Sequence, residues 1–200
     1  GVVREGTARA GLTDVGALGT TAGPSKSSGT LELGTSRPYS GSASLHAIWL
    51  FQDLVRAREF LPVNPKSGAI RWSPTQTPAD GAWYDPGGQI FLGGEEYTSA
   101  DTSLHEFGHN YMWNYKGDWS NDCPNPHYFT SAEPVRCAYT EGWATFFALS
   151  ANGNPVYNWE SGSSIDLESP TWGTPGWSNG DAVEGRVVGA LWDLMDNAFD

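Results

Sequence analysis

The segment Thr102–Trp113, TSLHEFGHNYMW, places two histidines four residues apart with a glutamate next to the first. Apolar residues recur at three- and four-residue intervals through it and just beyond it: Leu104, Phe107, Tyr111 and Tyr115. This period predicts an amphipathic helix, and Thr98 with Asp101 gives the spacing of a capping box at its start. On such a helix His105 and His109 lie on one face, about 6 Å apart along the axis.

Two imidazoles on one helical face form a nitrogen pair that zinc binds well. Glu106 projects near the same point without being forced into the coordination sphere, which is where a general base for a metal-activated water must lie. Hydrolytic zinc also needs a third protein ligand and an open site. Glu141 is the best candidate, because it is an acidic residue at the start of an otherwise apolar helix, YTEGWATFFALSA, and metal coordination would offset the cost of burying it.

A plainer reading of HEFGH is a helix with surface imidazoles and an incidental glutamate. Small residues that follow Glu141 on one face, namely Ala144, Thr145 and Ala148, would let the second helix approach the histidine helix closely. The combination of the two segments favours the metal reading. His46 has no spaced partner, so we expect it to be an ordinary core or surface residue.

The other segments predict a mixture of helices and short strands. Residues 1–42 suggest strands and loops, and 44–61 a helix that ends at Pro62. AWYDPGGQIFLGG predicts a β-hairpin whose second strand is Gln89–Leu92. The segments 117–137 and 151–180 are loop-like, and the final twenty residues, DAVEGRVVGALWDLMDNAFD, predict another helix.

Charge and cysteine content limit the function classes. The net charge of -12, from 23 Asp and Glu against 11 Lys and Arg, makes binding to a phosphate backbone improbable, so we expect no nucleic acid partner. No apolar run approaches the roughly 20 residues needed to cross a bilayer, and no leader opens the chain, so it is either cytosolic or already processed. The spacing of Cys123 and Cys137 suits one disulfide and an oxidising compartment, with two reduced buried thiols as the alternative.

HEFGH followed by EGWATFFA resembles the gluzincin clan of metallopeptidases, most closely its fungalysin and thermolysin side. The resemblance implies a zinc ion held by His105, His109 and Glu141, with Glu106 as the general base. It implies that Gln89–Leu92 is the edge strand along which a peptide substrate lies. It also implies that the helix containing EGRVVGALWDL packs beneath the site.

The chain departs from this family at two positions. Where the family has an aspartate that orients the first histidine, this chain has Thr145, and where it has an oxyanion-stabilising histidine, this chain has Ala182. A peptidase needs a donor for the developing oxyanion. Four residues are candidates for this role, of which the first two are preferred: His127, Tyr128, Tyr139 and Arg186.

We therefore expect a single α+β catalytic domain, residues 1–200, with a zincin-like fold. Its upper half, 1–113, would hold a small mixed sheet, a backing helix and the active-site helix, and its mainly helical lower half, 114–200, would supply Glu141. The expected function is that of a monomeric, secreted (extracellular) zinc endopeptidase acting on protein or peptide substrates. The alternatives are a non-catalytic zincin-like binding or scaffold module, favoured by Thr145 and Ala182, and a zinc hydrolase of non-peptide amides.

Calcium is a second candidate cofactor. The acidic clusters at Glu95–Glu96 and Asp118–Asp122 offer the oxygen ligands that calcium takes. Neither cluster has the alternating ligand pattern of an EF-hand loop, so a solvated acidic surface is the favoured interpretation.

Overall fold

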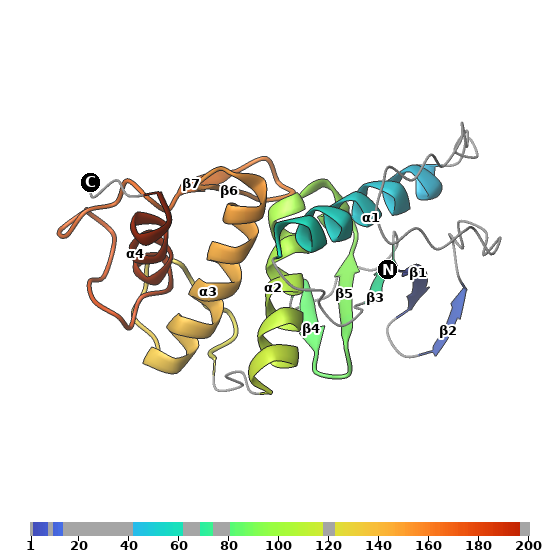
Figure 1. The fold of residues 1–200 in the computed structure, drawn as a ribbon, viewed down its shortest axis with the longest axis horizontal. Coiled ribbons are helices and arrows are strands. Elements are labelled where there is room, and N and C mark those ends of the chain that lie inside the picture. Colours follow the sequence, from blue (N-terminus) through green and yellow to red (C-terminus); the bar gives the residue numbers. More distant parts are fainter. Residues whose placement is uncertain are drawn as a thin grey trace.

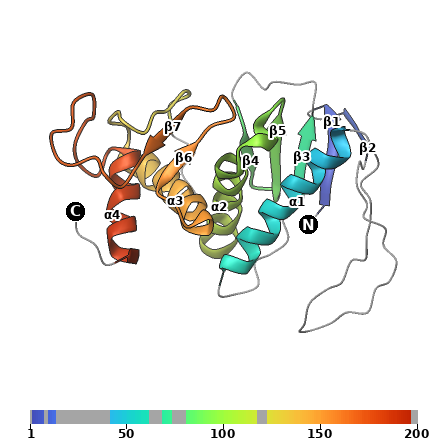
Figure 2. The ribbon, with the colours of Figure 1, turned by 90° about the horizontal axis from the view of Figure 1, so that it is seen from above.

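The structure is a computed structural model that describes residues 2–7, 10–13, 42–61, 69–73, 81–117 and 123–196. Its elements in chain order are β1 (Val2–Thr7), β2 (Ala10–Thr13), α1 (Ser42–Phe60), β3 (Ala69–Ser73), β4 (Trp83–Asp85), β5 (Gln89–Gly93), the 3-10 turn η1 (Glu96–Thr98), α2 (Ala100–Lys116), α3 (Val135–Asn152), β6 (Val156–Asn158), β7 (Ser164–Asp166) and α4 (Glu184–Asp196). The larger sheet lies at one end of the molecule, α3 and α4 lie at the other, and α2 runs between them (Figures 1 and 2). This arrangement is the α+β class that the sequence predicts.

Within the described residues the larger sheet has five strands in the order β2-β1-β3-β5-β4. β1 pairs in parallel with β3 and β3 with β5, while β2 and β4 pair antiparallel with their neighbours, so the sheet is mixed as expected. The predicted hairpin is present, with Trp83 opposite Phe91 and their rings stacked at 4.0 Å. The expectation that Gln89–Leu92 is the edge strand is wrong, because β3 occupies its other side and β4 forms the edge.

α1 backs this sheet and α2. Its residues Leu50, Leu54 and Ala57 are buried. They belong to one core together with residues of the sheet and of α2: Ile70, Trp72, Ile90, Leu92, Leu104 and Phe107. His46 lies partly buried beside this core, where its ring stacks on Tyr97 at 3.7 Å and meets the edge of Trp72 at 5.5 Å. His46 is therefore a packing residue, as the sequence predicts.

The histidine helix α2 is buried over its first turns, from Asp101 to Asn110, because the sheet and α1 cover one side and α3 covers another. Ser99 caps its start by accepting a hydrogen bond from the Thr102 backbone N–H. The predicted cap at Thr98 is therefore one residue too early; the Thr98 hydroxyl instead donates to the Glu95 carbonyl. The helix ends at Lys116 and is capped by Gly117, whose φ of 69° is the left-handed conformation that glycine adopts readily.

A second core joins α3 and α4 to the small β6–β7 hairpin. It consists of Leu149, Tyr157, Leu167, Val188 and Trp192. The hairpin lies in the segment 151–180 that the sequence suggests is a loop, and its strands have three residues each, too few for a recognisable alternation. The predicted division after residue 113 falls within α2, which continues to Lys116.

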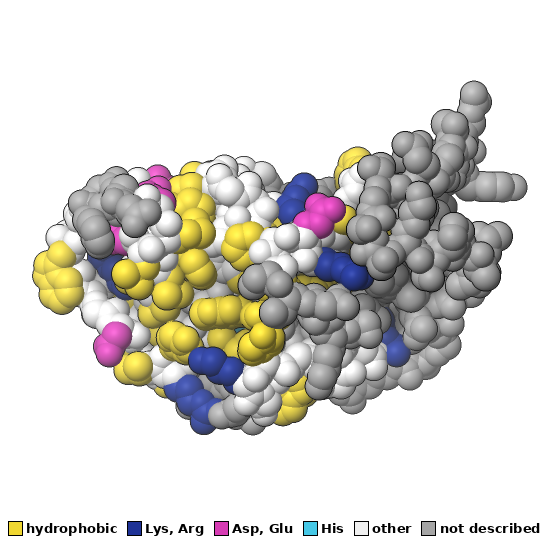
Figure 3. All heavy atoms as spheres, in the orientation of Figure 1, with side chains coloured by type: hydrophobic (Ala, Val, Ile, Leu, Met, Phe, Trp, Pro, Cys, Tyr) yellow, Lys and Arg dark blue, Asp and Glu magenta, His cyan; other side chains and the backbone are white. Residues whose placement is uncertain are grey.

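The surface over α3 and α4 carries several large apolar side chains. Figure 3 shows hydrophobic side chains gathered over these helices on one face. The large exposed apolar residues of the two helices are Val135, Tyr139, Leu194 and Met195. None of the described helices is long and apolar enough to span a bilayer.

The monomeric state stays a prediction.

Candidate metal centre

Helices α2 and α3 touch through small residues, Gly108 and Ala144. A methyl group on Gly108 would lie 3.0 Å from the Cα atom and 3.1 Å from the carbonyl oxygen of Ala144. The two backbones are therefore in direct contact one residue before His109. The close approach that the small residues of α3 predict is present, and it brings Glu141 within reach of both histidines.

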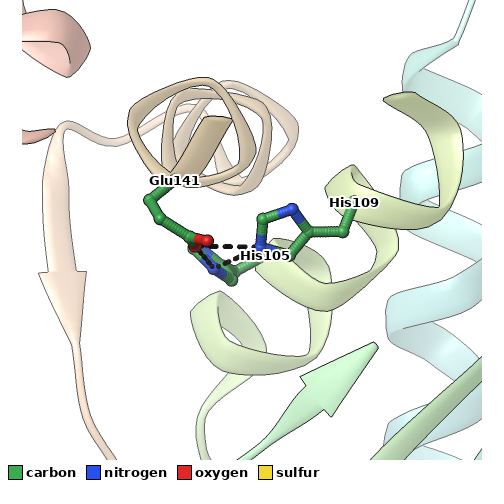
Figure 4. A group of neighbouring side chains, drawn as sticks. All are labelled: His105, His109 and Glu141. Atoms are coloured by element: carbon green, nitrogen blue, oxygen red, sulfur yellow. Dashed lines mark hydrogen bonds and ion pairs between the residues drawn. The ribbon is translucent and has the colours of Figure 1, made fainter. Parts of the chain in front are cut away.

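The side chains of His105, His109 and Glu141 converge between the two helices (Figure 4). The Oε2 atom of Glu141 lies 3.2 Å from Nε2 of His105 and 3.0 Å from Nε2 of His109, and the two Nε2 atoms are 3.1 Å apart. All three side chains are buried. The three predicted ligands are thus brought together, one nitrogen or oxygen atom from each.

This triangle fits a zinc ion. Tetrahedral zinc with bonds of about 2.0–2.1 Å to nitrogen and oxygen separates its ligand atoms by roughly 3.3 Å, close to the 3.0–3.2 Å separations of the three atoms. Two neutral imidazoles and one carboxylate form a donor set common in hydrolytic zinc sites. In the described part of the chain, the other group of potential ligands is Cys123, Cys137 and Glu141, and its two cysteines form a disulfide.

The two glutamates of the site have opposite electrostatic environments. Burial opposes the charge of Glu141, but His109 and His105 outweigh it and hold the pKa of this carboxyl well below its usual range. Burial raises the pKa of Glu106 to about 7, with His105 lowering it and Glu141 raising it. Glu141 is thus set up as an anionic ligand, and Glu106 as a group that exchanges a proton near neutrality.

His105 is supported on its other ring nitrogen. Its Nδ1 atom lies 2.9 Å from the Thr145 hydroxyl, which donates to Oε1 of Glu184 at 3.1 Å. Since the only proton of the hydroxyl goes to the carboxylate, the hydroxyl accepts from Nδ1–H of His105. This leaves Nε2 of His105 as the nitrogen that can bind a cation beside Glu141. Thr145 therefore fills the place of the aspartate that the family resemblance led us to expect.

Of the four oxyanion candidates, His127 and Tyr128 lie at the site. His127 donates from Nδ1 to Oε2 of Glu184 at 3.0 Å, and its Nε2 atom lies 3.9 Å from Oε2 of Glu141. The hydrogen bond to Glu184 outweighs burial and raises the pKa of His127 to about 9. Tyr128 lines the same cavity and is 59% exposed.

Tyr139 and Arg186 are placed elsewhere. Tyr139 is 41% exposed on α3, with the Lys116 ammonium 5.6 Å from its ring centroid. Arg186 donates to the carbonyls of Pro170, Thr171 and Ser178 and lies over the Trp177 ring. Both side chains therefore have structural contacts outside the centre.

A disulfide ties the loop that carries His127 to the helix that carries Glu141. Cys123 and Cys137 are bonded, as the sequence predicts, with their Cα atoms 5.0 Å apart. Cys137 lies one helical turn before Glu141, and the sulfur of Cys123 is 3.5 Å from Oε1 of that glutamate. The bond limits the freedom of the loop next to the site.

A cavity of about 510 Å³ opens beside the histidines. Its polar wall contains His105, Glu106 and His127. The rest of its lining includes four apolar or aromatic side chains: Phe129, Tyr157, Trp159 and Ile165. The Trp159 ring lies 5.6 Å from Phe129 and 5.2 Å from Tyr157, so these aromatic residues support one another.

Glu184 is the site residue that the sequence did not reveal. It is 1% exposed and is the first residue of α4. An acidic residue in the first turn of a helix is common for reasons of helix polarity alone, so its presence carried no signal. The one feature of the sequence that could have raised the question is that Glu184 interrupts a run of small and apolar residues, between Val183 and Gly185.

The acidic clusters considered for calcium give no further site in the described residues. Glu96 accepts a hydrogen bond from the Gly93 backbone N–H at 2.7 Å, and burial raises its pKa to about 7. Neither Glu95 nor Glu96 belongs to a described group of three potential ligands. Asp118–Asp122 lies outside the described residues. Calcium binding stays a prediction.

Comparison with known proteins gives a family. The model of the mycolysin C-terminal domain matches residues 62–200, which include all the residues of the centre described above. No curated protein and no solved structure matches the chain. The family is a domain of fungalysin- and mycolysin-type metallopeptidases, which agrees with the resemblance of the two sequence motifs at the level of a related peptidase family. The chain belongs to the mycolysin C-terminal domain family.

Proposed function

We propose that the chain is a zinc-dependent endopeptidase with a zincin-like fold, secreted and acting on extracellular protein. The observation that carries the proposal is the convergence of His105, His109 and Glu141 on one buried point, with Glu106 beside it in the wall of a cavity. Membership of a metallopeptidase domain family supports a peptide substrate. The disulfide supports an oxidising compartment.

The two histidines and Glu141 would hold the metal, which when bound supplies a Lewis acid that polarises a carbonyl and activates water. Glu106 would take a proton from the attacking water and deliver it to the leaving amine, a role suited to its pKa of about 7. The His127 imidazole would stabilise the negative charge that develops on the substrate carbonyl oxygen.

The lining of the cavity supports a peptide substrate over a small amide. Its polar wall holds the proposed catalytic side chains, and its aromatic wall offers a surface for an apolar residue next to the cleaved bond. The neighbouring sheet edge is β4, so an extended peptide would pair with Trp83–Asp85. Two contacts support catalysis over a non-catalytic module. The Thr145 hydroxyl binds Nδ1 of His105, where it would orient this ligand, and His127 is held beside the ligands by Glu184, where it would replace the histidine absent at Ala182.

The test is Glu106→Gln in the zinc-loaded protein, assayed on casein and on a quenched peptide library. Loss of the general base should lower kcat/KM by about 100- to 10,000-fold while zinc content stays at one ion per chain. Glu59→Gln, an exposed glutamate on α1, is the matched control and should keep full activity. Undiminished cleavage by Glu106→Gln would remove Glu106 from the mechanism.

The same assay separates the other candidate functions. Wild-type protein that binds one zinc ion and cleaves no peptide would support a binding or scaffold module. Cleavage of small amides without cleavage of peptides would support an amide hydrolase.

A further inference from the structure

We propose that Glu184 is a shared positioning residue, whose two carboxylate oxygens hold the metal ligand His105 and the His127 imidazole in place at the same time. One oxygen acts on His105 through the Thr145 hydroxyl, and the other binds His127 directly. The inference rests on the proposed zinc site. It adds that the two functions of the centre, metal binding and charge stabilisation, depend on one side chain from a third helix.

The first half of the proposal concerns the orientation of His105. The chain of contacts from Nδ1 of His105 to Thr145 and on to Glu184 contains two hydrogen bonds of 2.9 and 3.1 Å, and both Thr145 and Glu184 are fully buried. Without an acceptor for its proton, the hydroxyl could instead donate to Nδ1 and so favour the tautomer in which Nε2 carries the proton. Glu184 therefore keeps Nε2 of His105 available to a cation.

The second half concerns His127, which lies on a loop and not on a helix. Its hydrogen bond to Oε2 of Glu184 is 3.0 Å long. The loop is also bound to the start of α4 through backbone contacts, since Gly185 N–H donates to the Phe129 carbonyl at 2.9 Å and Ala132 bridges to Val183. Glu184 and the His127 loop are thus held as one unit, and Nε2 of His127 faces the metal ligands.

A helix-capping role alone does not account for Glu184. An acidic residue in the first turn stabilises a helix through the charge of its exposed terminus. The oxygens of Glu184 are instead directed to α3 and to the His127 loop, and the side chain is 1% exposed. A buried carboxylate with both oxygens committed to neighbours of the site is arranged for positioning.

The experiment combines three variants of the full chain. Thr145→Val removes the hydroxyl at nearly constant volume, His127→Asn removes the imidazole, and Glu184→Gln alters both contacts. Zinc dissociation constants come from chelator competition, and kcat comes from the quenched peptide at saturating zinc. Thr145→Ser, which keeps the hydroxyl, is the matched control for the first variant.

Thr145→Val should weaken zinc binding by about 10- to 100-fold with a small change in kcat. Thr145→Ser should bind zinc as tightly as the wild type. His127→Asn should lower kcat by about 100-fold or more with zinc binding unchanged. Glu184→Gln should show both losses, and adding Thr145→Val to Glu184→Gln should cause little further loss of zinc binding, because the two side chains act in series.

Three results would overturn the proposal. In the first, Glu184→Gln changes the melting temperature but neither the zinc dissociation constant nor kcat. In the second, it affects only one of the two constants. In the third, Thr145→Val weakens zinc binding as strongly in the Glu184→Gln background as in the wild type. Glu184→Gln could fail to fold. In that case Glu184→Asp replaces it, because aspartate retains the charge on a shorter side chain. The same zinc comparison is then made with Thr145→Val and Thr145→Ser.

Failure of the proposed function is distinguishable from failure of this inference. If the wild type cleaves no peptide, the zinc measurements still decide the His105 half. The His127 half is then read from the ¹H–¹⁵N ring correlation of His127 in the metal-free protein, which should change in Glu184→Gln and stay as in the wild type in Thr145→Val.

Discussion

Buried carboxylates in this molecule differ in which neighbouring groups offset the cost of burying their charge. Glu141 has two imidazoles within 3.2 Å, whereas Asp53 on α1 has the Arg56 guanidinium at 3.7 Å as an ion-pair partner. Burial raises the pKa of Asp53 from 3.8 to about 6, although Arg56 and a hydrogen bond from Ser103 lower it and Asp101 raises it. The ionised Asp53 carboxylate therefore destabilises the folded state at neutral pH.

This difference predicts a pH-dependent stability for Asp53→Asn. Because the pKa of Asp53 is higher in the folded state, the contribution of Asp53 to stability is fully present below about pH 4 and is lost as the pH rises through 6. Asparagine does not ionise, so the variant should gain stability relative to the wild type between pH 4 and pH 7.5, on the order of 2–3 kcal/mol. Urea unfolding at several pH values measures the gain, and a difference that stays constant with pH would contradict it.

At the residue scale, sequence predicts what is local. His105, Glu106 and His109 share one helix, so their mutual geometry follows from helical spacing. Glu141 was predictable because a carboxylate in a largely apolar helix needs a partner. Its expected place at the start of that helix was wrong, because α3 begins at Val135. The link from His127 to Glu184 spans 57 residues and joins a loop to a helix terminus, and no local pattern encodes it.

At the scale of elements, the helices are encoded by local sequence, whereas the order of the strands depends on contacts between distant segments. α1, α2, α3 and α4 follow from periodicity, caps and prolines within each segment. The position of β5 depends on its parallel pairing with β3, although β4 lies between these two strands in the sequence. Predicting the wrong edge strand was therefore an error about pairing partners and not about the strand itself.

The contact between α2 and α3 gives the prediction that belongs to this scale. In an open helix, glycine to alanine stabilises by up to about 1 kcal/mol. Gly108→Ala should instead destabilise by about 1–3 kcal/mol through overpacking, because its methyl group would meet the Ala144 backbone at 3.0 Å. It should also weaken zinc binding, since parting the helices moves Glu141 from the histidines. A more stable Gly108→Ala variant, found by thermal unfolding, would refute the close contact.

At the scale of the whole molecule, the proposed zinc site lies where the two cores meet. His105 and His109 come from α2, which packs in the core with the large sheet, while Glu141 comes from α3, whose Phe147 joins that core and whose Leu149 joins the other. A metal that needs ligands from both helices binds the folded state only. Its presence should therefore link the stability of the two parts.

Zinc should accordingly raise the unfolding free energy, by about 4 kcal/mol at a free concentration 1,000 times the dissociation constant. Calorimetry with zinc and with EDTA measures the shift in melting temperature. Glu106→Gln should keep the shift, because Glu106 is not a ligand in the proposal, and His109→Ala should lose it. Equal melting temperatures with zinc and EDTA would contradict a shared site.

The Cys123–Cys137 bond has a practical consequence for preparing the protein. The two sulfurs and a carboxylate oxygen of Glu141 lie within 4.8 Å of one another. Expression in a reducing cytosol, or storage with dithiothreitol, would leave two thiols next to that carboxylate, and thiolates are strong ligands for soft cations such as cadmium. Such material would have a competing set of donors at the same glutamate, so zinc stoichiometry should be measured on oxidised protein from a periplasmic or secreted preparation.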